Sequence, residues 1–181
     1  LMGTLADIVR QGKALYVGLS NYSKQEAEKA ALLLKDMGVH CLIEQPRYNM
    51  FERTPEDGLF KAMWEHGVGC ICYSPLAQGA LTDKYLNGIP QGSRASRVGT
   101  TINDRYLSEE KLDQIRRLNE IAVSRNQSLA QMALAWVLRE KAVTSVLIGA
   151  SSVRQLENSV QCLDHLEFSA DELKAIDEIL K

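Results

Sequence analysis

Residues 14–45 read ALYVGLSNYSKQEAEKAALLLKDMGVHCLIEQ and predict a strand, a helix and a second strand in that order. The first strand is expected over Ala14 to Leu19, a short apolar run bounded by glycine and asparagine. A capping box, Ser23-Lys-Gln-Glu26, opens the helix, Gly38 ends it, and Cys41 to Gln45 forms the second strand. Because a helical crossover returns the chain to the same edge of a sheet, the two strands are expected to pair in parallel.

The same alternation continues to the end of the chain. A helix is expected before residue 14 as well, and because its apolar spacing starts at Leu1 with no capping residue ahead of it, the chain is predicted to begin inside that helix. The stretch Ser74 to Leu107 is rich in Gly, Ser and Asn and is predicted to be a long irregular loop, of a length at which loops are usually functional or disordered. Further strands are expected at Val68 to Tyr73 and Ser145 to Ile148, and further helices from Thr54-Pro55 to Gly67, at Ser108 to Arg125, Ser128 to Glu140 and Val153 to Leu163, and from Ser169 to Lys181.

Parallel strands alternating with helices leave two architectures, a doubly wound sheet and a β/α barrel. The doubly wound sheet calls for Gly-x-Gly-x-x-Gly after a strand, whereas Gly67-Val-Gly69 precedes one and lacks the third glycine. A barrel needs eight strands and about 250 residues. The sequence therefore predicts an α/β fold in which residues 1–181 are a single incomplete domain, half of a barrel, with a long loop and an extra C-terminal helix.

Composition narrows the class of protein. The chain has 181 residues, a net charge of −2, 45% hydrophobic and 24% charged residues, as ordinary globular proteins do. Lys and Arg are mixed with Asp and Glu, which argues against a nucleic-acid partner, and no apolar run is long enough to span a membrane. A cytoplasmic location is therefore expected. The four cysteines have no zinc-like spacing and are predicted to be buried, reduced thiols.

Polar residues stand where the apolar strand runs stop. Ser20, Asn21, Gln45 and Ser74 follow the first three strands, and working groups of β/α barrels lie at such carboxyl ends. The amides of Asn21 and Gln45 could bind a carboxamide, and the ring of Tyr73 could stack on a flat heterocycle. The alternative is that these residues only cap the following turns and that Tyr73 belongs to the core.

The last strand end predicts an anion site. Gly149 lets the backbone approach closely, Ser151 and Ser152 offer hydroxyls, and a helix N-terminus with Arg154 follows. Against this, Ser152-Val-Arg-Gln155 is also a capping box that the helix alone would require. Two loop cations, Lys84 and Arg94, could close over a phosphate as a lid or could simply be solvated. The three histidines, His40, His66 and His165, have no nearby carboxylate or cysteine at ligand spacing, so no metal site is expected.

Four motifs lie at these strand ends, namely Gly18-Leu-Ser-Asn-Tyr22, Glu44-Gln-Pro-Arg-Tyr-Asn49, Tyr73-Ser-Pro-Leu-Ala-Gln-Gly79 and Leu147-Ile-Gly-Ala-Ser-Ser152. In order and spacing they resemble the last four strand motifs of the aldo-keto reductases, NADP(H)-dependent carbonyl reductases built on a (β/α)8 barrel. The resemblance implies the C-terminal half, about strands 5 to 8, of a (β/α)8 TIM barrel. The loop Lys84 to Pro90 with Ser93-Arg94 is similar to the branch that contains potassium-channel β subunits and bacterial L-glyceraldehyde 3-phosphate reductases.

The resemblance implies a role for each motif residue in binding NADP(H). Ser20, Asn21 and Gln45 would hold the nicotinamide carboxamide, and Tyr73 would stack on the ring. The pyrophosphate path would be lined by Ser74, Pro75, Leu76 and Gln78, and Lys84 and Arg94 would close over phosphate. Ser151, Gln155 and Asn158 would serve the 2′-phosphate and adenosine end, although this chain has Gln155-Leu-Glu-Asn-Ser159 where the family usually has Gln-Leu-x-Glu-Asn.

The family's catalytic Asp, Tyr, Lys and His come from its first four strands, and nothing in this sequence corresponds to those motifs. The resemblance therefore implies reduction of a small aldehyde or ketone by hydride transfer. This chain would supply the cofactor-binding half and no catalytic residue, and it is expected to be inactive by itself. Its partner would be the missing N-terminal half. Three alternatives stay open: a cofactor-sensing regulatory subunit like the channel partners, a non-catalytic truncated fragment, and a half-barrel that pairs with a second copy, since two open sheet edges favour association.

Overall fold

The computed structural model describes residues 1–97 and 99–181 and is an α/β structure built on a parallel sheet. The chain forms two compact units. Unit 1 comprises Leu1–Tyr48, Glu52–Tyr73 and Glu140–Leu147, and unit 2 comprises Asn49–Phe51, Ser74–Arg139 and Ile148–Lys181. The sheet lies wholly within unit 1.

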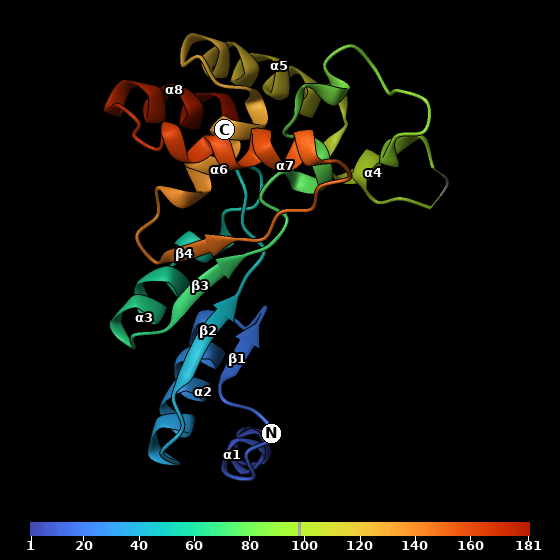
Figure 1. Ribbon diagram of the computed structural model, residues 1–181. Helices are drawn as coiled ribbons and strands as arrows, with labels where there is room; N and C mark the ends of the chain where they lie inside the picture. The colour runs from blue at the N-terminus through green and yellow to red at the C-terminus, as the bar shows by residue number, and fades with distance from the viewer. Residues whose placement is uncertain (98) are drawn as a thin grey trace. The chain divides into compact units, whose positions relative to one another are not determined.

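Four strands form the sheet of unit 1: β1 (Val17–Ser20), β2 (Cys41–Gln45), β3 (Gly69–Cys72) and β4 (Val143–Val146). They lie in the order β1-β2-β3-β4, and Figure 1 shows their arrows pointing the same way, in agreement with the parallel pairing of each neighbouring pair. The prediction of parallel strands alternating with helices is therefore confirmed. Because the strands are parallel, the residues that end β1, β2 and β3 lie along one edge of the sheet.

Three helices belong to unit 1: α1 (Met2–Arg10), α2 (Lys24–Asp36) and α3 (Leu59–Glu65). They contact each other or the strands, and α2 and α3 lie along one face of the sheet (Figure 1). The predicted capping box opens α2, because the Ser23 hydroxyl accepts from the Glu26 N–H and the Glu26 carboxylate accepts from the Ser23 N–H at 3.0 Å. This helix buries Ala27, Ala30, Ala31 and Leu34, which are the small and apolar residues of its inner face.

The two faces of the sheet differ. On β1, Val17 and Leu19 are buried, whereas Gly18 between them is exposed and faces the other way. A Cβ atom added at Gly18 would lie 2.7 Å from Cγ1 of Ile43, and one added at Gly69 would lie 2.7 Å from Oγ1 of Thr144. Glycine at these two positions therefore leaves room for side chains of the neighbouring strands on this face.

All four cysteines are buried and free, as predicted: Cys41, Cys70 and Cys72 in unit 1 and Cys162 in unit 2. Burial raises the pKa of Cys41 to about 11 and the pKa values of Cys70 and Cys72 to about 12. Burial also raises the pKa of Cys162. These thiols are therefore protonated and poorly nucleophilic at neutral pH.

Unit 2 contains the helices α4 (Ile102–Tyr106), α5 (Glu109–Ser124), α6 (Leu129–Leu138), α7 (Val153–Val160) and α8 (Ala170–Leu180). In this unit α6 is the central element, because it contacts α5 and α7 and buries eight of its ten residues. In contrast α7 buries none. Short 3-10 helices occupy Ala77–Gly79, Asp83–Tyr85, Arg94–Ser96 and Gln161–Asp164.

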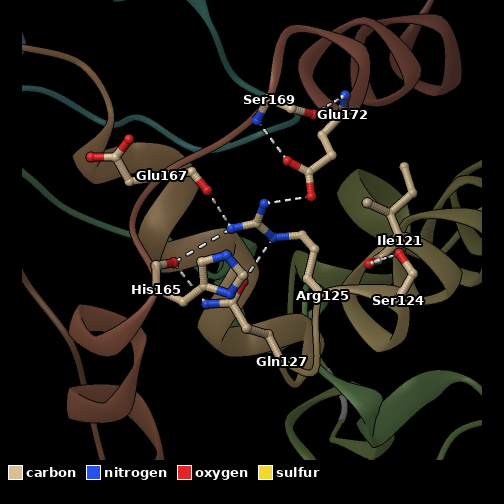
Figure 2. Close-up of polar contacts among 8 residues, drawn as sticks. All are labelled: Ile121, Ser124, Arg125, Gln127, His165, Glu167, Ser169 and Glu172. Atoms are coloured by element: carbon tan, nitrogen blue, oxygen red, sulfur yellow. Dashed lines mark hydrogen bonds and ion pairs between the residues drawn. The ribbon is translucent and has the colours of Figure 1, made fainter.

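A buried arginine joins the end of α5 to the segment before α8 (Figure 2). The side chain of Arg125 is 1% exposed, and its Nη1 lies 2.7 Å from Oε1 of Glu172. Its Nη2 donates to the carbonyl oxygen of Glu167 at 2.9 Å, and its Nε donates to Oε1 of Gln127 at 2.9 Å. The guanidinium carbon also lies 3.8 Å from the ring centroid of Phe168. One side chain thus ties two segments that are about 40 residues apart in sequence.

Several predicted features are wrong in detail. The first strand, predicted from Ala14 to Leu19, spans Val17–Ser20, and the stretch predicted as a loop from Ser74 to Leu107 contains α4. Thr54-Pro55 opens a 3-10 helix, Thr54–Glu56, and α3 begins only at Leu59 after Gly58 in a left-handed conformation (φ 103°). The fourth strand begins and ends two residues earlier than predicted, at Val143 and Val146, because Val143 pairs with Cys70. The helix predicted to run to Leu163 changes at Gln161 to a 3-10 turn.

Within the described part of the chain, no helix has the length and apolarity to cross a membrane.

Candidate functional site

The strand ends of unit 1 bring four of the predicted site residues together. Ser20 ends β1, Asn21 follows it, Gln45 ends β2, and Tyr73 follows β3. The backbone N–H of Asn21 donates to the carbonyl oxygen of Gln45 at 3.3 Å. The loop that leaves β1 is therefore fastened to the end of β2.

Side chains extend this contact into a continuous line of hydrogen bonds. The Tyr73 hydroxyl donates to Oδ1 of Asn21 at 3.1 Å, and Nδ2 of Asn21 donates to Oγ of Ser20 at 3.2 Å. The Ser20 hydroxyl in turn donates to the carbonyl oxygen of Gln45 at 2.9 Å. Ser20 and Asn21 are exposed, so these polar groups are accessible to a ligand at the edge of the sheet.

A buried carboxyl group, that of Glu44, was not predicted from the sequence and accepts a hydrogen bond from the loop that leaves β1. Glu44 is 0% exposed, and its Oε1 accepts a hydrogen bond from the N–H of Tyr22 at 3.3 Å. Burial raises the pKa of Glu44, while backbone hydrogen bonds from Tyr22 and Asn21 act to lower it. Because Asn21 adopts a left-handed conformation (φ 58°), these contacts help to hold a backbone geometry that few residues other than glycine accept.

A second missed residue is Arg47, which lies two positions beyond Gln45. Its Nε donates to the Tyr73 hydroxyl at 3.2 Å, and its guanidinium carbon lies 5.2 Å from the centroid of the Tyr73 ring. The Nε atom also lies 3.5 Å from Oε2 of Glu52. Strand alternation could have found Arg47, since residues two apart on an extended chain point to the same side.

In unit 2, the turn after β3 holds four predicted residues in an unusual backbone. Ser74 and Gln78 have left-handed φ angles of 54° and 60°. The buried amide of Asn49 donates to the Ser74 carbonyl at 3.0 Å and so fixes the start of the turn. Pro75 is buried and Leu76 is half-buried, while Nε2 of Gln78 donates to Oγ1 of Thr101 at 3.3 Å.

The start of α7 differs from the predicted capping box. The Ser152 hydroxyl does accept from the N–H of Gln155 at 3.2 Å. However, Oε1 of Gln155 accepts from the N–H and hydroxyl of Ser151, at 2.8 and 2.9 Å, and not from the N–H of Ser152. The box is therefore incomplete, because Gln155 reaches one residue further back. Ser151 and Gln155 are both exposed and directly bonded at this helix N-terminus.

The remaining predicted residues of unit 2 are Asn158, Lys84 and Arg94, and Asn158 makes its hydrogen bonds to residues other than Ser151 and Gln155. Asn158 faces α6, where its Nδ2 donates to Oγ of Ser128 at 3.3 Å and its Oδ1 accepts from Nε2 of Gln131 at 3.2 Å. Lys84 is exposed in the 3-10 helix Asp83–Tyr85. Arg94 begins another 3-10 helix, and the prediction for its side chain falls outside the described residues.

The three histidines lie just outside regular elements, after α3, before β2 and after the 3-10 helix Gln161–Asp164. His66 ends α3, the ring of His40 lies 3.3 Å from the carbonyl oxygen of Gly67, and the backbone carbonyl of His165 accepts from Gln127. Over residues 1–97 and 99–181, no group of three or more His, Cys, Asp or Glu side chains could hold a metal ion.

The fold and this edge define a class, that of α/β proteins with polar residues at the carboxyl ends of parallel strands. The chain belongs to the aldo/keto reductase family, whose pattern it matches over residues 1–181. The prediction that the chain resembles this family is thereby confirmed.

Individual relatives agree with the branch suggested by the sequence. The chain is 50% identical over 178 residues to L-glyceraldehyde 3-phosphate reductase of Escherichia coli (strain K12), an alignment that covers 96% of this chain and 51% of that protein. It is 35% identical over 179 residues to a putative voltage-gated potassium channel subunit beta of Schizosaccharomyces pombe, covering 96% and 52%. The chain thus spans about half the length of the curated relatives it matches.

Proposed function

We propose that this chain is the NADP(H)-binding, C-terminal half of an aldo-keto reductase, which reduces a small aldehyde or ketone. In this proposal residues 1–181 form one incomplete domain that contributes about strands 5 to 8 of a (β/α)8 barrel. The observation that supports it best is the line of hydrogen bonds joining Tyr73, Asn21, Ser20 and Gln45 at the carboxyl edge of the sheet. We also propose a cytoplasmic location, which cell fractionation would test.

The residues of unit 1 suit a nicotinamide group. A carboxamide needs both hydrogen-bond donors and acceptors. At the carboxyl ends of β1 and β2, Ser20, Asn21 and Gln45 supply hydroxyl groups, amide N–H groups and amide oxygen atoms. The half-buried ring of Tyr73 next to them offers an aromatic face. When bound, the cofactor would supply a hydride from its nicotinamide ring. The chain's own residues would orient that ring and keep it in place.

The residues of unit 2, taken by themselves, suit an anionic group, and the proposal assigns them to the phosphates of NADP(H). Ser151 and Gln155 would serve the 2′-phosphate end, where the N-terminus of α7 also favours negative charge. Ser74, Pro75, Leu76 and Gln78 would line the pyrophosphate path, and the exposed Lys84, with Arg94, would close over phosphate. In this proposal Asn158 reaches the adenosine end only if it exchanges its bonds to α6.

The proton-donating residues would come from outside this chain. The relatives are about twice its length, which leaves room for an N-terminal half that carries the family's Asp, Tyr, Lys and His. The chain by itself is then expected to bind NADPH and to show no turnover.

Titration of the chain with NADPH, followed by nucleotide fluorescence, tests this function. We expect saturable binding, with no NADPH oxidation on adding L-glyceraldehyde 3-phosphate or a simple aldehyde. Turnover is expected only when the chain is joined to the N-terminal half of a relative. Failure to bind NADPH in either form would contradict the proposal, and turnover by the chain alone would contradict the assignment of the proton donors.

A cofactor-sensing regulatory subunit is the second candidate, favoured by the 35% identity to a protein named as a channel subunit. The discriminating measurement is made on the polypeptide that contains both halves. Tight NADPH binding with no oxidation by any aldehyde tested would favour the sensor. Oxidation at enzymatic rates would favour the reductase.

Open surfaces predict how the isolated chain behaves in solution. β1 and β4 end the described sheet, and α7 with its following turn exposes an apolar row made of Val153, Leu156, Val160 and Leu163. We propose that the missing half covers such surfaces and that a second copy can replace it, giving a homo-oligomer. Analytical ultracentrifugation of the isolated chain should show self-association, and a compact, stable monomer over a wide concentration range would contradict this.

A further inference from the structure

The inference concerns Arg47, which stands at one end of the line of hydrogen bonds in unit 1. Arg47 is bridged to Tyr73 through the backbone as well as through its side chain. The full order of donors is Arg47 to Tyr73, Tyr73 to Asn21, Asn21 to Ser20 and Ser20 to the carbonyl of Gln45. All five residues belong to unit 1, so the order depends only on contacts within that unit.

The two ends of this line give it a fixed polarity. A guanidinium can only donate hydrogen bonds, and a backbone carbonyl can only accept them. Between these ends, the hydroxyl groups of Tyr73 and Ser20 and the amide of Asn21 could each act as donor or acceptor. With Arg47 donating to the Tyr73 oxygen, the Tyr73 proton is directed to Oδ1 of Asn21, and Nδ2 of Asn21 is directed to Ser20.

Without the arginine the amide has two comparable orientations. In the reversed one, Nδ2 of Asn21 would donate to the Tyr73 oxygen, and the Ser20 hydroxyl would donate to Oδ1 of Asn21 in place of the Gln45 carbonyl. That arrangement makes two side-chain hydrogen bonds at Asn21 as well, and it also leaves one N–H of Nδ2 unused, but beside Tyr73 instead of beside Ser20. In the presence of Arg47 it would give the Tyr73 oxygen two donors and leave its proton without the Asn21 acceptor. Arg47 is therefore the group that distinguishes the two orientations.

We propose that Arg47 is a positioning residue that, through Tyr73, holds the Asn21 side chain with its unused amide N–H on the Ser20 side, and so fixes where the site offers a donor to the carbonyl oxygen of a ligand. The inference rests on the proposed function and deepens it. The bond to Ser20 uses one of the two N–H groups on Nδ2, and the exposed position of Asn21 leaves the other for the carboxamide oxygen of a nicotinamide.

Two cofactor analogues test this selectivity. Thionicotinamide adenine dinucleotide phosphate replaces the carboxamide oxygen with sulfur, a weak acceptor, and the 3-acetylpyridine analogue keeps the oxygen but lacks the NH2 group. In Arg47→Met the affinity ratio of NADP+ to the thio analogue should fall roughly threefold to tenfold, the value of one hydrogen bond. The ratio of NADP+ to the acetylpyridine analogue should stay the same. Ratios between oxidised cofactors cancel the change in charge.

The matched control is Glu52→Gln, which removes the ion pair to Arg47 but leaves the donor to Tyr73 in place. This variant should keep both affinity ratios. A second control is Tyr73→Phe, which keeps the ring and breaks the line. In a Tyr73→Phe background, adding Arg47→Met should leave the affinity ratio of NADP+ to the thio analogue the same as in Tyr73→Phe alone. An equal fall in both backgrounds would mean that Arg47 does not act through Tyr73 and would overturn the proposal.

A ligand-free measurement separates this inference from the proposed function. The side-chain amide resonances of Asn21 in a 15N-labelled chain should shift in Arg47→Met and stay in place in Glu52→Gln. If NADP+ binds and the Asn21 resonances or the thio ratio do not respond to Arg47→Met, the inference is wrong and the function stands. If the resonances respond but no nucleotide binds, the proposed function fails, and with it the ligand assigned to this amide.

Discussion

Arg125→Met is expected to lower the free energy of unfolding by about 3 kcal/mol, because it removes a buried guanidinium together with its hydrogen bonds and its ion pair to the partly exposed Glu172. The change leaves the carbonyl oxygen of Glu167 and the side chain of Gln127 without the donor drawn in Figure 2. It also removes the cation from the ring of Phe168. A urea denaturation curve at neutral pH measures this loss of unfolding free energy.

The matched control is Arg117→Met on the same helix, where the arginine is half-exposed and lies 4.0 Å from Asp113. Its effect should stay within about 0.5 kcal/mol. Equal losses for the two variants would contradict the role assigned to the buried arginine.

The effect of Arg125→Met should also depend on pH. Burial acts to raise the pKa of Glu172, but hydrogen bonds from Ser169 and Arg125 outweigh burial and lower it. A carboxyl group with a lowered folded-state pKa stabilises the fold above its usual pKa and loses that contribution as pH falls through the folded value. The difference between the original chain and Arg125→Met should therefore shrink in acid, and a difference that grows in acid would contradict this sign.

Tyr73→Ala is expected to raise the Kd for NADPH roughly tenfold to a hundredfold, because it removes an aromatic face and the link between Arg47 and Asn21. Tyr73→Phe keeps the ring and should have a smaller effect. Fluorescence titration with NADPH measures both.

Tyr16→Ala serves as the control for Tyr73→Ala, since Tyr16 is 66% exposed just before β1 at the opposite end of that strand. Its Kd should match that of the original chain. If Tyr73→Ala bound NADPH as tightly as Tyr16→Ala does, Tyr73 would not be part of the nicotinamide site.

Local signals in the sequence predicted most of the secondary structure. The capping boxes at Ser23, Ser128 and Ser169 each begin a helix, and the strand Cys41 to Gln45 has the predicted bounds. These features depend on neighbours in sequence. The start of the fourth strand at Val143 depends instead on pairing with Cys70, a contact that no local pattern encodes.

In the candidate site too, local sequence predicted which residues take part, whereas contacts between distant residues decide how they bond. Alternation and strand ends were enough to identify Ser20, Asn21, Gln45 and Tyr73 as candidates, because parallel strands end at one edge. Which atoms bond was not predictable, since the orientation of Asn21 depends on Arg47 from the next strand end. Glu44 was missed because it lies on the buried face, where the strand pattern predicts an apolar side chain.

Each of the two units contains at least one buried thiol that can report local unfolding of that unit. Because Cys41, Cys70 and Cys72 lie inside unit 1 and Cys162 lies inside unit 2, an alkylating reagent can reach each group only when its surroundings transiently unfold. Mass spectrometry of peptides labelled over time would therefore give separate local-opening rates for the sheet and for the helical part, without adding any probe. Comparing these rates with and without nucleotide would show which part of the chain the cofactor rigidifies.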